Sequence, residues 1–108
     1  NLMIQLYNAT PDEALADTDV TVSMDGVSRT FPAGHVVRLF PGESITLTPG
    51  LYHSFRGEEG KGTVLLGEIS MCNDDLTDNR FYDKVGRFPK IEEDEEPLYL
   101  LCNEYGGR

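Results

Sequence analysis

The residues Val20-Thr-Val-Ser-Met-Asp-Gly-Val-Ser-Arg-Thr-Phe31 decide the fold class of this chain. Two runs that alternate apolar and polar side chains flank Asp25-Gly26, which is the strongest short-range signal for a β-hairpin. Working outward from this hairpin, further strands are predicted at residues 2–7, 36–40, 44–48, 51–55, 63–70 and 97–102. Turn residues separate them about every eight to twelve positions, and no helical pattern of normal length occurs. The sequence therefore predicts an all-β fold, an antiparallel sandwich or barrel.

The composition limits the classes of partner. The 108 residues are enough for one domain. The formal net charge is −10, with 19 acidic against nine basic residues, which argues against binding to nucleic acid or to an anionic membrane. An acidic C-terminal segment, residues 91–97, contains the run Glu92–Glu96 and is predicted to be solvated.

Cysteine usage indicates the redox compartment. Cys72 and Cys102 are the two cysteines, and their spacing matches neither a metal motif nor a dense disulfide framework. Reduced thiols in a cytoplasmic protein are the favoured interpretation, with a single disulfide as the alternative. No apolar run reaches the length of a membrane span.

His53 is the candidate metal ligand. It lies in the strand that follows the Pro49-Gly50 turn, and alternation places it on the same face as Leu51 and Phe55. An imidazole on the inner wall of a small β-barrel could bind a metal, whereas the alternative is a core histidine or an ordinary strand residue. His35 has no partner at ligand spacing and is predicted to lie at the surface or at a strand edge.

Two acidic features follow His53. Glu68 is flanked by Leu66 and Ile69, so it is either a general base inside a barrel or a carboxylate on the solvated face of a strand. Residues 73–83 form an acidic stretch, but Asp78 and Lys84 stand where a calcium-binding EF-hand loop requires Gly and Glu. The alternative is a turn-forming loop whose side chains cap its own backbone.

The spacing from Gly42 through Gly50 to His53 resembles the second conserved motif of the cupin superfamily, with the proline displaced by one position, to Pro49, and Gly57 at the usual asparagine position. Together with Gly67-Glu-Ile-Ser70, Asn73-Asp-Asp-Leu-Thr-Asp-Asn-Arg-Phe81 and Gly86-Arg-Phe-Pro-Lys-Ile-Glu-Glu-Asp94, this motif makes nearly the whole chain resemble the bacterial D-lyxose isomerase family of cupins.

The resemblance implies a cupin-type antiparallel β-barrel of the jelly-roll kind, incomplete as given. It implies that residues 1–108 are the C-terminal part of a single domain and that the chain, which begins at Asn1, lacks an N-terminal half. The implied activity is that of a D-lyxose ketol-isomerase, which interconverts D-lyxose and D-xylulose by proton transfer through an enediol. Family members are commonly homodimers.

The resemblance also implies roles for particular residues. One divalent metal, usually Mn2+ with Zn2+ or Co2+ as alternatives, would take His53 as a ligand and its remaining ligands from the absent first motif. Glu68 would be the proton-transfer base, and Asp78 and Arg80 would contact the sugar or order the loop. Two other functions stay open, a non-catalytic sugar-binding cupin and a metal-free β-sandwich interaction module.

Overall fold

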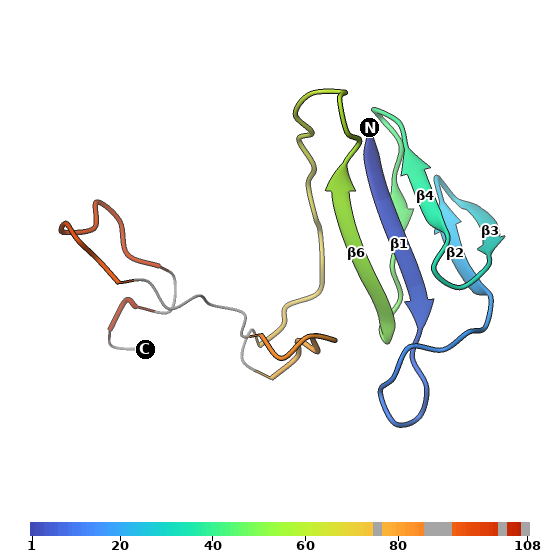
Figure 1. The fold of residues 1–108 in the computed structure, drawn as a ribbon, viewed down its shortest axis with the longest axis horizontal. Helices are drawn as coiled ribbons and strands as arrows, with labels where there is room; N and C mark the ends of the chain where they lie inside the picture. Colours follow the sequence, from blue (N-terminus) through green and yellow to red (C-terminus); the bar gives the residue numbers. More distant parts are fainter. Residues whose placement is uncertain (75–76, 86–91, 102–103, 107–108) are drawn as a thin grey trace. The chain divides into compact units, whose positions relative to one another are not determined.

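The computed structural model describes residues 1–74, 77–85, 92–101 and 104–106. The chain divides into two compact units, Asn1–Met71 and Cys72–Arg108, which are described separately. The first unit holds the assigned strands β1 (Leu2–Asn8), β2 (Val20–Met24), β3 (Val27–Phe31), β4 (Val36–Leu39), β5 (Ile45–Thr46) and β6 (Leu51–Gly57) (Figure 1). No helix occurs among the described residues.

The six strands form two antiparallel sheets, with strand orders β4-β1-β6 and β3-β2-β5. The core lies between these sheets, because residues from both belong to one buried cluster: Ile4, Leu6, Val37 and Leu39 from the first and Val20 and Val22 from the second. Alternate residues of β1, β2 and β4 point into this cluster, as a sheet with one buried face requires. We call the face of β4-β1-β6 that carries this cluster the inner face.

The predicted hairpin is confirmed. Met24 pairs with Val27 across a two-residue turn, and both Asp25 and Gly26 have positive φ, at 50° and 79°. This backbone matches the turn that Asp-Gly favours between twisted strands. The Asp25 carboxylate also accepts hydrogen bonds from the backbone N–H and the hydroxyl of Ser44, at 2.9 and 2.8 Å, just before β5.

A polar cluster ties the start of β1 to the end of β6. The Asn1 side-chain amide donates to the Glu58 carboxylate at 2.5 Å, and the Arg38 guanidinium of β4 lies 2.8 Å from the other carboxylate oxygen. The hydrogen bond from Asn1 lowers the pKa of Glu58, and the charge of Arg38 acts in the same direction against partial desolvation. The cluster joins residues 57 positions apart.

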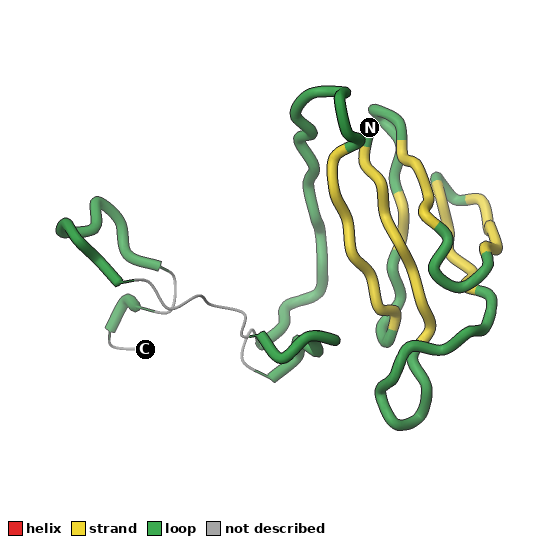
Figure 2. The backbone as a smooth tube through the Cα atoms, viewed as in Figure 1, coloured by secondary structure: helices red, strands yellow, loops and turns green. Residues whose placement is uncertain are grey.

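The all-β prediction is therefore confirmed, and the two sheets are consistent with an incomplete cupin-type barrel. The strand predicted at 44–48 is shorter, since β5 covers only Ile45–Thr46. The strand predicted at 63–70 is wrong for this chain, and residues 97–101, the described part of the last predicted strand, form none either. A strand requires a hydrogen-bonded neighbour, and none of the described residues pairs with these two segments. Figure 2 draws the stretch after β6 as loop.

The second unit has no assigned helix or strand in its described residues. Glu92–Glu96 are exposed, as expected for a solvated acidic run, while Ile91, the first residue of the predicted segment 91–97, and Cys102 lie outside the described residues. Cys72 is an exposed free thiol. That residues 1–108 belong to a single domain of the whole protein stays a prediction.

Within the described part of the chain, no helix has the length and apolar character needed to cross a membrane.

Candidate functional site

The strand β6 places His53 on the inner face of its sheet. His53 lies directly opposite Leu6 of β1, and Phe55 lies opposite Ile4. Directly opposed residues of an antiparallel pair project to the same side. Since Ile4 and Leu6 belong to the buried cluster, the predicted face of His53 agrees with the register.

The turn before β6 explains how the chain reaches this position. Gly50 has a φ of 85°, a conformation that residues with a Cβ rarely adopt. The backbone N–H of Leu51 donates to the Thr48 carbonyl at 3.4 Å, which closes the Pro-Gly turn. Seven residues of β6 then pair continuously with β1, so the register that points His53 inward is set along the whole strand.

A backbone hydrogen bond orients the His53 ring. Its Nδ1 lies 3.2 Å from the Leu51 carbonyl oxygen. A carbonyl can only accept, so this bond requires the proton on Nδ1 and leaves Nε2 of the neutral ring with its lone pair. Metal-binding histidines commonly donate their second ring N–H to a backbone carbonyl in this way. The ring therefore fits a metal ligand that binds through Nε2.

The inner face is not closed around His53. β6 is an edge strand of its sheet, and both His53 and Phe55 are exposed, Phe55 by 52%. From β6, only the partly buried Leu51 packs against the buried cluster, and the imidazole stands at an open margin. This position is accessible to a ligand or to another part of a protein.

His53 belongs to no cluster of metal ligands in the described part of the chain. The described residues contain no group of three or more His, Cys, Asp or Glu side chains that could hold a metal ion. His53 thus provides one ligand, and a structural or catalytic metal requires at least three protein ligands.

His35 has a different environment, as predicted. It is exposed, precedes β4, and its ring stacks on Phe31 with centroids 5.3 Å apart. Its backbone N–H donates to the Pro32 carbonyl at 3.1 Å, within the turn that leads into β4. His35 is therefore a surface residue that serves as a matched control for His53.

Glu68 lies in the segment that forms no strand. Its side chain is exposed, and the neighbouring apolar residues Leu65 and Ile69 are exposed by 98% and 102%. The structure therefore places Glu68 in neither of the two strand environments considered from sequence. Its role as the proton-transfer base stays a prediction.

Asp78 orders the acidic loop. Its carboxylate accepts the backbone N–H of Asp74 at 2.6 Å, and its own N–H donates to the Asp74 carbonyl at 2.9 Å. Thr77 makes a second backbone bond to the same carbonyl, at 3.1 Å. These bonds are the self-capping arrangement that was the alternative to a cation site. Arg80, in the same loop, is exposed; contact of Asp78 or Arg80 with a sugar stays a prediction.

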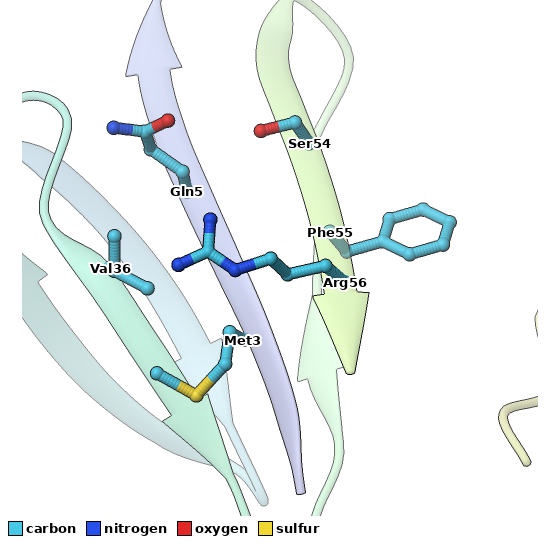
Figure 3. A pocket seen from close by; sticks show the side chains of 6 residues that line it. All are labelled: Met3, Gln5, Val36, Ser54, Phe55 and Arg56. Carbon is cyan, nitrogen blue, oxygen red and sulfur yellow. The ribbon is translucent and has the colours of Figure 1, made fainter. Parts of the chain in front are cut away.

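A small hollow of about 80 Å3 lies on the opposite, outer face of the sheet (Figure 3). Gln5, Ser54 and Arg56 contribute its polar groups, while the Phe55 ring points away from it. Pockets for small ligands are typically about 300–1,000 Å3. This hollow is too small for a sugar, and the register puts it on the other side of the sheet from His53.

Sequence reasoning missed the residues that fix β6 from outside the motif. Tyr52 donates its hydroxyl proton to the Glu13 carbonyl at 2.6 Å, and Glu58 anchors the far end of the strand through Asn1. Glu13 has a positive φ of 63°, which is unusual for a residue with a side chain. These partners are distant in sequence, so no local pattern could have indicated them.

Two antiparallel sheets with a motif histidine on the inner face define an incomplete cupin-like β fold. The D-lyxose isomerase family matches residues 1–105 of the chain. Over 105 residues, it is 56% identical to a D-lyxose/D-mannose isomerase of Serratia proteamaculans and 51% identical to one of Escherichia coli O157:H7. Each comparison covers 97% of this chain but 46% of the relative, so the chain spans about half the length of the curated relatives it matches. The chain belongs to the D-lyxose isomerase family.

Proposed function

We propose that this chain is part of a metal-dependent sugar isomerase that interconverts D-lyxose and D-xylulose. The observation that carries the proposal is the family match over residues 1–105, with relatives at 51–56% identity that are named D-lyxose/D-mannose isomerase. Both named sugars are aldoses, and D-mannose is therefore a second substrate to test. The geometry of His53 supports the metal-dependent part of the proposal.

His53 is the ligand that this chain contributes. Its Nε2 lone pair is left available by the bond between Nδ1 and the Leu51 carbonyl, and its place beside Leu6 gives the ring one apolar neighbour across the ladder. A divalent metal, with Mn2+ as the first candidate and Zn2+ or Co2+ as alternatives, would polarise the sugar oxygens when bound. The remaining ligands would come from polypeptide outside these 108 residues.

The reaction needs a group that moves a proton between C2 and C1 of the open-chain sugar. A carboxylate can remove the C2 proton to give the enediol and return it to C1. Glu68 is proposed for this task, because it is the carboxylate of the Gly67–Ser70 motif. Asp78 and Arg80 are proposed to hold the loop that follows, where Asp78 already caps the backbone of Asp74.

The full-length protein tests this proposal by its turnover of D-lyxose and D-mannose and by its bound metal. His53→Ala should lower metal content sharply and abolish turnover, because the coordination shell loses a ligand. His35→Ala should change neither, since that ring stacks on Phe31 at the surface. Normal metal content in His53→Ala would refute the assigned ligand. A protein that binds metal and sugar without turnover would be the non-catalytic cupin instead.

A further inference from the structure

The carbonyl that orients the His53 ring belongs to the peptide unit between Leu51 and Tyr52. The six atoms of a peptide unit are held close to one plane, so this carbonyl turns only together with the backbone of both residues. The first of these residues is anchored on the inner face, because the Leu51 side chain packs against the buried cluster. An anchor on Tyr52 would therefore also hold the acceptor of the 3.2 Å hydrogen bond from His53 Nδ1.

Tyr52 has such an anchor on the outer face of the sheet. Its hydroxyl donates to the Glu13 carbonyl at 2.6 Å, across 39 positions of sequence. Tyr52 lies opposite Tyr7 in the ladder, and as neighbours in β6 the Tyr52 and His53 side chains point to opposite faces. The tyrosine therefore acts on the imidazole through the backbone that the two residues share.

The loop that presents the Glu13 carbonyl is itself tied to the sheet. It follows β1 and lies at the end of the sheet where β6 begins (Figure 1). The Glu13 N–H donates to the Thr10 carbonyl at 3.0 Å, and the Ala16 N–H donates to the Asn8 carbonyl at 2.9 Å. Asn8 in turn pairs with Leu51. The acceptor of the tyrosine hydroxyl thus stands on backbone that is fixed to the partner strand of β6.

Glu13 adopts a backbone conformation that residues with a side chain rarely occupy, with a φ of 63°. Such a conformation is unfavourable for any residue with a Cβ, and it persists where the surrounding bonds over-determine it. The backbone bonds of the loop hold Glu13 in this conformation, and the bond from Tyr52 adds to them. The contact between the two residues is therefore part of an arrangement that the fold maintains at a cost.

We propose that Tyr52 is a positioning residue for the metal site, which acts on His53 through the Leu51 carbonyl. Its bond to Glu13 holds this carbonyl in place to accept the Nδ1–H of His53, which keeps Nε2 available for the metal. Hydrogen-bond partners of a metal-bound histidine typically contribute about 10–100-fold in metal affinity. The metal part of the inference rests on the proposed function, whereas the orientation of the ring does not.

The tautomer of the His53 ring in the metal-free full-length protein tests the positioning directly. Nitrogen NMR of the neutral ring should show the proton mainly on Nδ1 in the wild type. Tyr52→Phe should lower the ratio of this tautomer to the other at least about twofold, because even a partial loss of a hydrogen bond shifts a two-state ratio by this much.

Tyr7→Phe is the matched control for this measurement. Tyr7 lies directly opposite Tyr52 on the same face, but its hydroxyl lies 3.3 Å from the Gln5 side-chain nitrogen. Its removal should leave the tautomer ratio of His53 unchanged. An unchanged ratio in Tyr52→Phe, or the same change in Tyr7→Phe, would overturn the proposal.

The Mn2+ affinity of the full-length protein gives an independent measurement. Tyr52→Phe should raise the dissociation constant about 10-fold, at the lower end of the range, because the carbonyl stays in the chain and only its orientation is released. Tyr7→Phe should bind Mn2+ as the wild type does. The melting temperatures of both metal-free variants should stay within about 4 °C of the wild type. Unchanged Mn2+ affinity in Tyr52→Phe would overturn the proposal.

A change at the acceptor tests whether the two residues act as a pair. Glu13→Pro should reproduce the loss of affinity, because proline fixes φ near −65° and moves the carbonyl. It should add nothing in the Tyr52→Phe background, since both changes break the same bond. Additive losses would overturn the proposed coupling. A wild-type protein that binds no Mn2+ would refute the metal-dependent function instead, and the tautomer ratio would still decide the role of Tyr52.

Discussion

Leu6→Ala should lower the stability of the fold that supports His53 without lowering the metal content of the protein. Leu6 is 1% exposed, belongs to the buried cluster and lies directly opposite His53. The substitution removes three carbon groups worth about 0.8 kcal/mol each, or roughly 2.4 kcal/mol. The cavity left behind raises the cost, and measured Leu→Ala changes in cores span about 2–5 kcal/mol.

We expect a loss of about 2.5–3.5 kcal/mol in the free energy of unfolding. This value lies in the lower half of the measured span of about 2–5 kcal/mol, because the neighbouring edge strand β6 is free to shift toward the cavity. Native proteins are stable by about 5–15 kcal/mol, so the variant should still fold. Urea unfolding of the metal-free full-length protein measures the change, and metal content after reconstitution should stay at the wild-type level.

His53→Ala should give the opposite result. His53 is exposed, so its removal should change the unfolding free energy of the metal-free protein by no more than about 0.5 kcal/mol while metal is lost. Leu98→Ala, at a side chain that is 86% exposed, controls for loss of surface area. Two results would refute this reasoning: a Leu6→Ala variant as stable as the wild type, or a His53→Ala variant as destabilised as Leu6→Ala. The second would make His53 a core histidine.

Two further predictions concern carboxylates. Glu68→Gln should lower kcat for D-lyxose by about 10²–10⁴-fold without loss of metal, because an amide cannot accept the proton. Near-normal turnover of this variant would exclude Glu68 as the base. A larger loss of turnover in Asp78→Asn would instead assign the base to the loop of residues 73–81. Glu58 has a lowered pKa because Asn1 donates to it and Arg38 lies beside it. It therefore adds stability above the ordinary carboxyl value of 4.5, and this contribution is lost as pH falls through its folded pKa. Stability measured between pH 7 and 3 should fall less steeply in Glu58→Gln, and an unchanged slope would contradict the assignment.

The sequence predicted the elements whose signals are local. Asp25-Gly26 specifies a turn with two positive φ angles, and alternation on either side specifies the strands that the turn joins. The same logic placed His53 on the correct face, because a period of two fixes the face of every residue once one strand is aligned. The hydrogen bond from the His53 ring to the Leu51 carbonyl is also local, because it spans only two residues.

The predictions that failed depend on partners far away in the chain. Residues 63–70 have the apolar composition of a strand, and two of their apolar side chains, Leu65 and Ile69, are fully or almost fully exposed. An apolar run reports only the side chains, whereas a strand exists only as a member of a ladder. The Asn1–Glu58 bond, 57 positions apart, was missed for the related reason that no local pattern encodes it.

The position of His53 on an edge strand links the chemistry of the site to the assembly of the fold. His53 lies on the outermost strand of its sheet, so further ligands for a shared metal have to be brought close to that strand. If the other ligands lie on polypeptide outside these 108 residues, the metal binds only when that polypeptide is packed close to His53. A ligand with affinity for one form of a protein stabilises that form by mass action. The metal would then stabilise the arrangement that creates its own site, and the open margin beside His53 is where that coupling would act.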